Sequence, residues 1–368
     1  MIKETNKITP FQLFFVLIQA QIGIGVISLP HDIFMVSKSD AWISVLVAGF
    51  LIEINILLIW LLYRRFPSMT IFEMLHLIIG KPASYVLKVL YILYFLSTLI
   101  LVIMMFGRMV NIWILPRTPV WVLSLLLIVI CIYCVKENIK VMARFNVVVS
   151  ICLVVLFVLI AFVIKETDFR YILPVASQSF PSILKGAQKA TSASLGYELL
   201  LVLFPLCMGK QSTKLKVALL ANGFATFFYT YLTIVSITYF GPAVMKLIPE
   251  PILYIMKFHS FQIIERTDLL FFSIWIVSVA TSFMVYLYCC TNGVVYLLKK
   301  VKHGSLAIAI GLLVYILFLF FPPTEEAIKL FGKYHSLASY FFIFIIPLLL
   351  LFVAIVRGKK ETSGAANS

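Results

Sequence analysis

The sequence predicts an all-α integral membrane protein with about ten transmembrane helices. Hydrophobic residues make up 62% of the chain, charged residues make up 12%, and the mean hydropathy is +1.08. A soluble domain has about 45–50% apolar and about 25% charged residues. The apolar residues form continuous blocks long enough to cross a hydrocarbon core of about 30 Å. Because these blocks do not alternate in polarity, they indicate helices rather than a β-barrel.

Each apolar block defines one predicted span. The spans are expected at about 11–36, 41–62, 84–110, 119–135, 143–164, 183–208, 216–240, 269–297, 305–321 and 335–356. The chain 1–368 is therefore expected to form a single polytopic membrane domain embedded in a lipid bilayer. Its polar end, 357–368, is expected to be a disordered cytoplasmic tail.

The net charge of +15 is distributed in short Lys/Arg clusters between the apolar blocks. This is the pattern of cytoplasmic loops, and it argues against a nucleic-acid partner. Loops on the side of both termini carry more Lys and Arg than the opposite loops. Both termini are therefore predicted to be cytoplasmic, which requires an even number of spans. No cleavable signal peptide is expected, because the first apolar block continues as a span.

No pattern for catalysis, a metal ion or a cofactor is present. Cys131 and Cys134 have the spacing of redox and zinc motifs, but neither a second pair nor a His lies nearby. The six cysteines are therefore interpreted as small buried hydrophobic residues. The five histidines, at positions 31, 76, 259, 303 and 335, are expected in loops or at helix ends. We accordingly expect a protein that is not an enzyme.

Two connections between spans carry further signals. The stretch 242–268 is too short and too charged to span, and we expect an external loop with an interfacial helix. The segment 322–326 is expected to be an external loop in which Thr324 caps a short helix. Between Asn146 and Ile164, span five contains no ionisable residue.

Two spans contain residues that interrupt a helix. Span one has Gly23, Gly25 and Pro30, and span six has Gly196 followed by Pro205. Each interruption opens a block of five spans, which defines repeats over about 9–165 and 180–356. Paired Gly/Pro interruptions indicate an inverted repeat of the transporter type, with a ligand site between the broken helices. The alternative is that Gly and Pro are simply common in membrane helices and allow close packing.

Ionisable residues at membrane depth indicate function by default. Glu198 directly follows the second break and has three candidate roles: binding a ligand amine, carrying a proton, or accepting hydrogen bonds from the freed N–H groups. Glu53 lies in the middle of span two, where a structural hydrogen bond is favoured. Lys185 and Lys189 share one helix face, so they line an outward vestibule or a solvated surface.

Small hydroxyl side chains also lie at depth in span eight. Thr281 and Ser282 are candidates for contact with a ligand or an ion. The alternative is hydrogen bonding to their own helix.

Two short motifs carry a family resemblance across the whole chain. They are Gly23-Ile24-Gly25 leading to Leu29-Pro30, and Gly196-Tyr197-Glu198 leading to Phe204-Pro205. These motifs resemble the B subunit of spore germination receptors, within the amino acid–polyamine–organocation superfamily. The resemblance implies a five-plus-five inverted fold of the leucine-transporter type. It also implies a place in the inner membrane of the spore with an A and a C subunit, and binding of a nutrient germinant such as an amino acid.

The resemblance further implies a ligand pocket between spans one, three, six and eight. The positions on spans three and eight follow from helix depth alone. The expected ligand-binding residues are Gly23, Gly25, Thr98, Leu101, Leu195, Gly196, Tyr197, Glu198, Leu199, Thr281 and Ser282. Some members of the superfamily couple transport to protons through a lysine in span five, which this chain lacks. A secondary amino acid transporter and a scaffold with an inactive pocket are the alternatives to a receptor.

Overall fold

The computed structural model describes residues 7–259, 266–298 and 301–361. Within these ranges, seven helices are long and apolar enough to cross a membrane. Three shorter apolar helices, at Pro10–Gln21, Val120–Val135 and Tyr197–Leu206, accompany them. All ten predicted spans correspond to helical segments, and this confirms the predicted all-α membrane fold.

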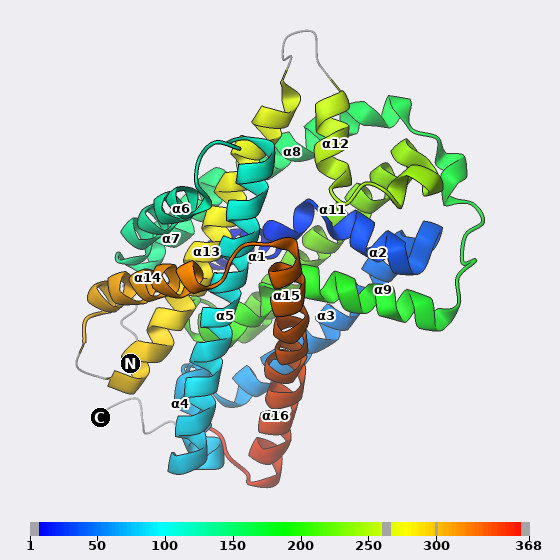
Figure 1. Cartoon of the computed structure of the whole chain (residues 1–368). Helices are drawn as coiled ribbons and strands as arrows, with labels where there is room; N and C mark the ends of the chain where they lie inside the picture. Colours follow the sequence, from blue (N-terminus) through cyan, green and yellow to red (C-terminus); the bar gives the residue numbers. More distant parts are fainter. Residues whose placement is uncertain (1–6, 260–265, 299–300, 362–368) are drawn as a thin grey trace.

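The order of elements in the first half of the chain is repeated in the second. The first half comprises α1 (Pro10–Gln21), α2 (Leu29–Ser37), α3 (Ala41–Arg65), α4 (Ile71–Ile79), α5 (Lys81–Trp113), α6 (Val120–Val135), α7 (Ile139–Val149) and α8 (Ile151–Phe162). The second comprises α9 (Phe180–Ala193), α10 (Leu200–Leu203), α11 (Gln211–Met245), α12 (Pro251–Phe258), α13 (Thr267–Leu298), α14 (His303–Phe320), α15 (Glu325–Tyr340) and α16 (Ile346–Val356). Each half thus has a broken helix, a long helix, a short one, a second long helix, a shorter span and a helix in two segments (Figure 1).

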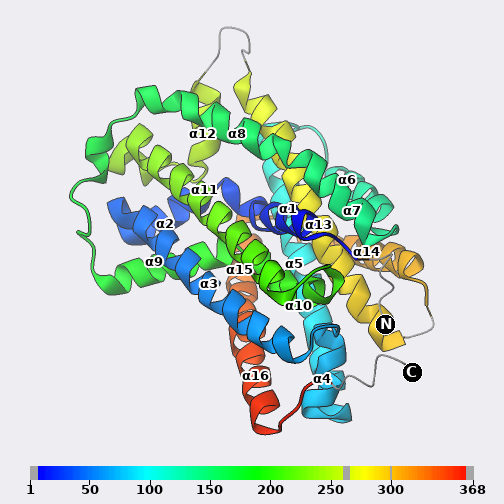
Figure 2. The same cartoon turned by 180° about the vertical axis from the view of Figure 1, so that it is seen from behind.

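The broken helices lie inside the bundle. Helix α1 packs against α11 and α13, and α2 packs along α9. Figure 2 shows α3 and α11 running side by side, and α5 and α13 form the corresponding pair of long helices. This arrangement places the first break between helices of the second half.

Local signals explain where several helices begin. Pro10 occupies the first turn of α1, and Thr9 caps it: the Gln12 N–H donates to Thr9 Oγ1 at 3.2 Å, and the Thr9 N–H donates to Gln12 Oε1 at 2.9 Å. Such a reciprocal capping box satisfies two otherwise unpaired donors. Thr324 caps α15 through a single hydrogen bond, which its Oγ1 accepts from the Ala327 N–H at 3.2 Å.

The predicted start of the last span, at 335, is wrong. Helix α15 begins at Glu325 and continues through a π-helical turn at Phe341–Ile345 into α16. Glu325 and Glu326 lie in the first turn, where carboxylates interact favourably with the helix dipole. These charged residues obscured the outer part of the span when hydropathy alone was considered.

The connection after span seven contains the short helix that we expected. Helix α12 buries Ile252, Ile255 and Met256 and packs against α13 and α11. Before α12, helix α11 bends at Gly241, which has a φ of 70° and is followed by Pro242. Part of the connection, 260–265, lies outside the described residues.

A short backbone bridge joins the start of the first broken helix to the end of the second. The Ile8 N–H donates to the Leu206 carbonyl at 2.8 Å, and the Met208 N–H donates to the Ile8 carbonyl at 2.8 Å. This parallel bridge pairs Ile8 with Cys207. It fixes the start of α1 beside the end of the second broken helix.

The first residues of the expected disordered tail contact the helical bundle. The Arg357 guanidinium donates to the Ile78 carbonyl at 3.1 Å, and the Glu361 N–H donates to the Arg65 carbonyl at 2.8 Å. The Glu361 carboxylate also accepts a hydrogen bond from the Ser68 N–H. Residues 357–361 therefore differ from the expectation, and 362–368 lie outside the described residues.

Candidate functional site

The first break leaves the α-helical path between Gln21 and Leu29. A 3-10 turn at Ile24–Val26 separates α1 from α2. A Cβ atom on Gly23 would lie 2.5 Å from Ser282 Oγ, and one on Gly25 would lie 2.7 Å from the Ala193 carbonyl oxygen. The break therefore packs directly against α13 and α9, and a side chain at either position would collide with these helices.

The second break packs against the first. Gly196 has a φ of 134°, and a Cβ atom there would lie 2.6 Å from the carbonyl carbon of Ala20. Its N–H donates to Glu198 Oε2 at 2.7 Å. The glycine thus meets two demands at once, an unusual backbone conformation and a close approach to the end of α1.

Glu198 is buried, with 1% of its surface exposed. Its carboxylate accepts hydrogen bonds from the Gly196 N–H and from the hydroxyls of Tyr286 and Tyr94, the last at 3.5 Å. Three roles were considered for Glu198: binding a ligand amine, carrying a proton, and accepting hydrogen bonds from N–H groups freed by the break. The contact with the Gly196 N–H corresponds to the third. Tyr286 connects the carboxylate to the neighbouring cavity, which its own side chain lines.

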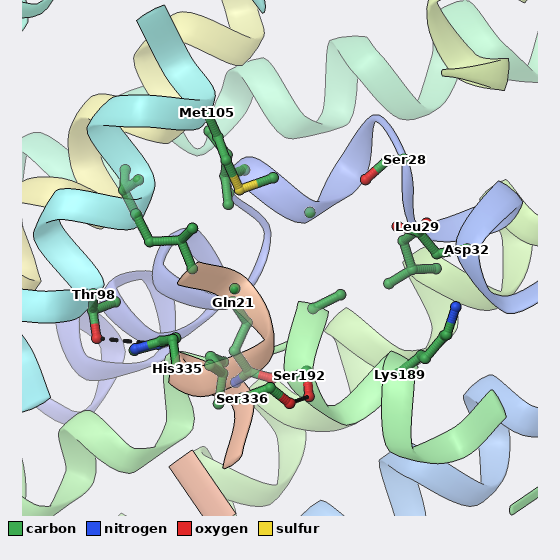
Figure 3. Close-up of a pocket in the computed structure, with 18 of the residues that line it drawn as sticks. Gln21, Ser28, Leu29, Asp32, Thr98, Met105, Lys189, Ser192, His335 and Ser336 are labelled. Atoms are coloured by element: carbon green, nitrogen blue, oxygen red, sulfur yellow. Dashed lines mark hydrogen bonds between the residues drawn. The ribbon is translucent and has the colours of Figure 1, made fainter. Parts of the chain in front are cut away.

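A cavity of about 680 Å³ lies beside the two breaks (Figure 3). Its lining comes from α1, α2, α5, α9, α13 and α15 together with both broken segments. Six of the predicted ligand-binding residues line it: Gly23, Gly25, Thr98, Leu101, Leu195 and Ser282. The other five do not belong to the lining: Gly196, Tyr197, Glu198, Leu199 and Thr281.

Those five residues are buried behind the cavity wall. The Thr281 hydroxyl donates to Gln19 Oε1 at 3.0 Å, whereas the Ser282 hydroxyl donates to the Gln19 carbonyl at 2.7 Å. Both hydroxyls therefore tie α13 to α1, in addition to bonding within their own helix. Tyr197 accepts a long hydrogen bond, 3.5 Å, from Asn55.

Sequence reasoning missed His335, which lies in the cavity wall. The side chain is buried, and its ring stacks on Tyr94 with centroids 5.3 Å apart. Its Nδ1 lies 3.0 Å from Ser97 Oγ, and its Nε2 lies 3.4 Å from Thr98 Oγ1. The expectation that His335 lies at a helix end is wrong, because α15 starts well before it.

Small hydroxyl side chains form the wall between α9 and α15. Ser192 Oγ and Ser336 Oγ lie 2.7 Å apart, and both residues line the cavity. The Tyr340 hydroxyl donates to the Gln188 carbonyl at 2.7 Å. The packing of α15 against the second broken helix therefore depends on polar contacts as well as on apolar ones.

The mouth of the cavity carries charged, exposed side chains. Lys185, Lys189, Lys329 and Asp32 all line it. Lys329 also donates to Glu325 at 2.6 Å. The placement of Lys185 and Lys189 agrees with the vestibule that we considered. Asp32 and Lys329 carried no sequence signal, since a single charge near a predicted loop is ordinary.

Glu53 has a structural partner, as expected. The Asn222 side-chain amide of α11 donates to Glu53 Oε1 of α3 at 2.8 Å. The same amide donates to the Gly49 carbonyl at 3.1 Å. Glu53 thus holds two long helices together, and it does not line the cavity.

Comparison with solved structures shows the fold. The structure of MhsT in complex with L-phenylalanine matches with a TM-score of 0.70 at 17% identity, covering 95% of this chain and 89% of that one. The outward-open state of a Na⁺-coupled sialic acid symporter matches with a TM-score of 0.64 at 12% identity, covering 93% and 80%. The fold is therefore the predicted leucine-transporter type, with five-plus-five helices of which the first and sixth are broken.

Sequence comparison shows the family. A family model described as "Spore germination protein" matches residues 7–328. Spore germination protein GerQB of Bacillus cereus is 26% identical over 94% of this chain and 95% of its own length. Spore germination protein YndE of Bacillus subtilis (strain 168) is 26% identical over 98% of this chain and 100% of its own length. The protein is thus a multi-pass membrane protein that belongs to the spore germination protein family.

Proposed function

We propose that the protein is the nutrient-sensing subunit of a spore germination receptor. In this role it binds a small amino acid in the cavity beside Gly23 and Gly25, and acts with an A and a C subunit in the inner membrane of the spore. Both termini then lie in the cytoplasm. The observation that carries the proposal is a cavity of about 680 Å³ that borders both helix breaks in a member of this family.

The electrostatics of the breaks support an amino acid as the ligand. Helices α1 and α9 both end at the cavity, at Gln21 and Ala193, whereas α2 begins there beside Ser28. The C-terminal ends of helices favour cations and N-terminal ends favour anions. An ammonium and a carboxylate on one small molecule match this arrangement. The apolar side chains of Leu101, Val102, Met105 and Leu195 complete the lining.

A ligand that binds one arrangement of the broken helices more tightly than another shifts their populations. Contacts between this chain and its partner subunits then respond to the shift. A germination assay tests the proposal with spores that lack this protein, using single nutrients and mixtures of nutrients. We expect the loss of at least one nutrient response and its return when the gene is restored. Normal germination with every nutrient and every mixture would contradict the proposal.

Secondary transport of an amino acid is the second candidate, favoured by the transporter fold. Uptake of labelled amino acid into proteoliposomes, with and without a Na⁺ or proton gradient, distinguishes the two functions. Gradient-driven accumulation would support the transporter. Saturable binding without accumulation would support the receptor.

A further inference from the structure

Gln21 is a buried side chain without a hydrogen-bond partner among the residues that the structure describes. Only 1% of its surface is exposed, and it lines the cavity at the end of α1. Neither Nε2 nor Oε1 of its amide hydrogen-bonds to any described residue. Buried polar groups are almost always paired, so each exception calls for an explanation.

Gln19, two residues earlier on the same helix, provides the contrast. It is also fully buried. Its Nε2 donates to Ser150 Oγ at 3.2 Å, and its Oε1 accepts from the Thr281 hydroxyl at 3.0 Å. One buried glutamine of α1 is therefore satisfied within the fold, whereas the other, which lines the cavity, has an amide donor and acceptor that bond to no described residue.

The side chain of Gln21 is not needed to hold its own backbone. The Gln21 carbonyl accepts a hydrogen bond from the Tyr229 hydroxyl at 2.7 Å, which ties the end of α1 to α11. The amide could be exchanged for an apolar group of equal length without breaking this contact. A polar group that costs stability when unpaired and supports no contact in the fold indicates a role in binding.

The surroundings of Gln21 differ from those of the cavity mouth. Figure 3 shows Gln21, Ser192, Ser336 and His335 together at one end, with Asp32 and Lys189 at the other. The end near Gln21 therefore has hydrogen-bonding groups, and the charged side chains lie at the mouth. It also lies where α1 and α9 end, so the backbone there favours a cation.

We propose that Gln21 selects α-amino acids by reading their ammonium and carboxylate groups together. Its Oε1 accepts a hydrogen bond from the ligand ammonium, and its Nε2 donates one to the carboxylate. An α-amino acid carries its ammonium donor and its carboxylate acceptor on one carbon atom. These adjacent groups match the acceptor Oε1 and the donor Nε2 of the glutamine amide. This inference rests on the proposed function and adds to it the residue that sets the class of ligand.

The proposal predicts discrimination against ligands that lack the amine. A site built to hydrogen-bond a polar group rejects the analogue without it, because the site's buried group is then left unpaired. The purified full-length chain is tested with L-alanine, L-valine and L-leucine. Each is compared with its amine-free acid, namely propanoate, 3-methylbutanoate and 4-methylpentanoate. We expect the wild-type chain to bind each amino acid at least about tenfold more tightly than the matching acid.

The decisive variant is Gln21→Met, which keeps the length of the side chain and removes the amide. We expect the discrimination to fall to about threefold or less, with a ligand-free melting temperature equal to or above that of the wild type. Gln19→Met is the matched control. It leaves Ser150 and Thr281 without their partner, so we expect it to lower the melting temperature. Gln21→Glu adds a charge that repels the carboxylate, and should weaken amino acid binding as well.

Several outcomes would overturn the inference. One is a Gln21→Met variant that discriminates like the wild type. Another is a ligand-free melting temperature that falls in Gln21→Met as far as in Gln19→Met, which would make the side chain structural. If both variants fail to fold, the side chain of Gln21 is likewise structural and the inference is overturned. A wild-type chain that binds both ligand series equally defeats the inference and leaves the receptor proposal standing. Binding of neither series defeats both.

Discussion

The peptide N–H of Gly196 donates a 2.7 Å hydrogen bond to the carboxylate of Glu198, two residues ahead. The acid therefore closes the second helix break from within, and tyrosines of α5 and α13 converge on the same carboxylate. A buried acid in a membrane protein is usually examined for function first. Here its contacts first explain how the break is held.

Replacing Glu198 is expected to destabilise the protein to an extent that depends on the new side chain. Glu198→Ala leaves the Gly196 N–H and the Tyr286 hydroxyl unpaired, at a cost of about 1–3 kcal/mol each. Glu198→Gln retains an acceptor oxygen and should cost less. Thermal melting of the two purified variants measures the order. Equal melting temperatures for Glu198→Ala and the wild type would show that the carboxylate does not hold the break.

Alanine at Gly25 or at Gly196 is expected to disrupt the cavity. In Gly25→Ala the new methyl group lies 2.7 Å from the Ala193 carbonyl oxygen, and in Gly196→Ala it lies 2.6 Å from the backbone of Ala20. Overpacking of this kind costs about 1–3 kcal/mol, and the φ of Gly196 adds strain. Melting temperature and amino acid binding are both measured.

Gly223→Ala is the matched control for these substitutions. Gly223 lies in the exposed part of α11, and a Cβ atom there meets nothing within 4 Å. Alanine is the better helix former, so stability should be unchanged or higher by up to about 1 kcal/mol. A control variant as unstable as Gly25→Ala would mean that the close approach at the break is not the cause.

Removing two positive charges from the cavity mouth should weaken binding of carboxylate ligands. We expect the double variant Lys185→Gln/Lys189→Gln to bind amino acids about two- to fivefold more weakly at low ionic strength. The effect should shrink near 0.15 M salt, where the screening length is about 8 Å. Lys333→Gln, an exposed residue of α15 outside the lining, is the control. A loss that does not depend on salt would argue against electrostatic attraction.

Glu250 provides a prediction about pH. Burial raises the pKa of this carboxyl above its ordinary value of 4.5; the positive charge of Arg108 opposes the rise, while Glu325 and Asp32 add to it. For an acid whose pKa is raised on folding, the contribution to stability is fully present below the ordinary pKa and is lost as pH increases through the folded value. Glu250→Gln should therefore melt at a higher temperature than the wild type at neutral pH.

The difference between Glu250→Gln and the wild type should disappear below pH 4.5, where the wild-type carboxyl is protonated in both states. Melting curves of both proteins from below pH 4.5 to neutral pH test the sign of this difference in stability. A difference that grows as the pH falls would show that ionised Glu250 stabilises the fold.

The sequence was sufficient to locate the two breaks, because glycine and proline inside an apolar block mark the interruption of a helix. The close packing that requires glycine at positions 23 and 25 depends on α13 and α9, and the sequence alone does not show it. Helix depth also placed part of the cavity wall correctly. Thr98 and Leu101 are three residues apart and share a helix face, and both line the cavity. Thr281 and Ser282 are adjacent, so they point in directions about 100° apart, and only Ser282 belongs to the lining. Depth alone does not specify which way a helix is rotated.

Other parts of the site depend on packing that a single sequence does not encode locally. His335 enters the wall because α15 begins at Glu325, in a segment whose charges resemble a loop. The unpaired amide of Gln21 is visible only when all neighbours of the side chain are known. Gln19 and Gln21 look equivalent in the sequence, and tertiary contacts alone distinguish them.

The bridge between Ile8 and Cys207 is made by the main chain, so it is insensitive to the identity of nearly every side chain around it. Proline is the exception, since it has no N–H to donate. A mutational search confined to alanine would therefore overlook this contact altogether. If the cavity opens toward the opposite face of the membrane, these two hydrogen bonds must break first, and Ile8→Pro would remove the one that the Ile8 N–H donates without touching the ligand site.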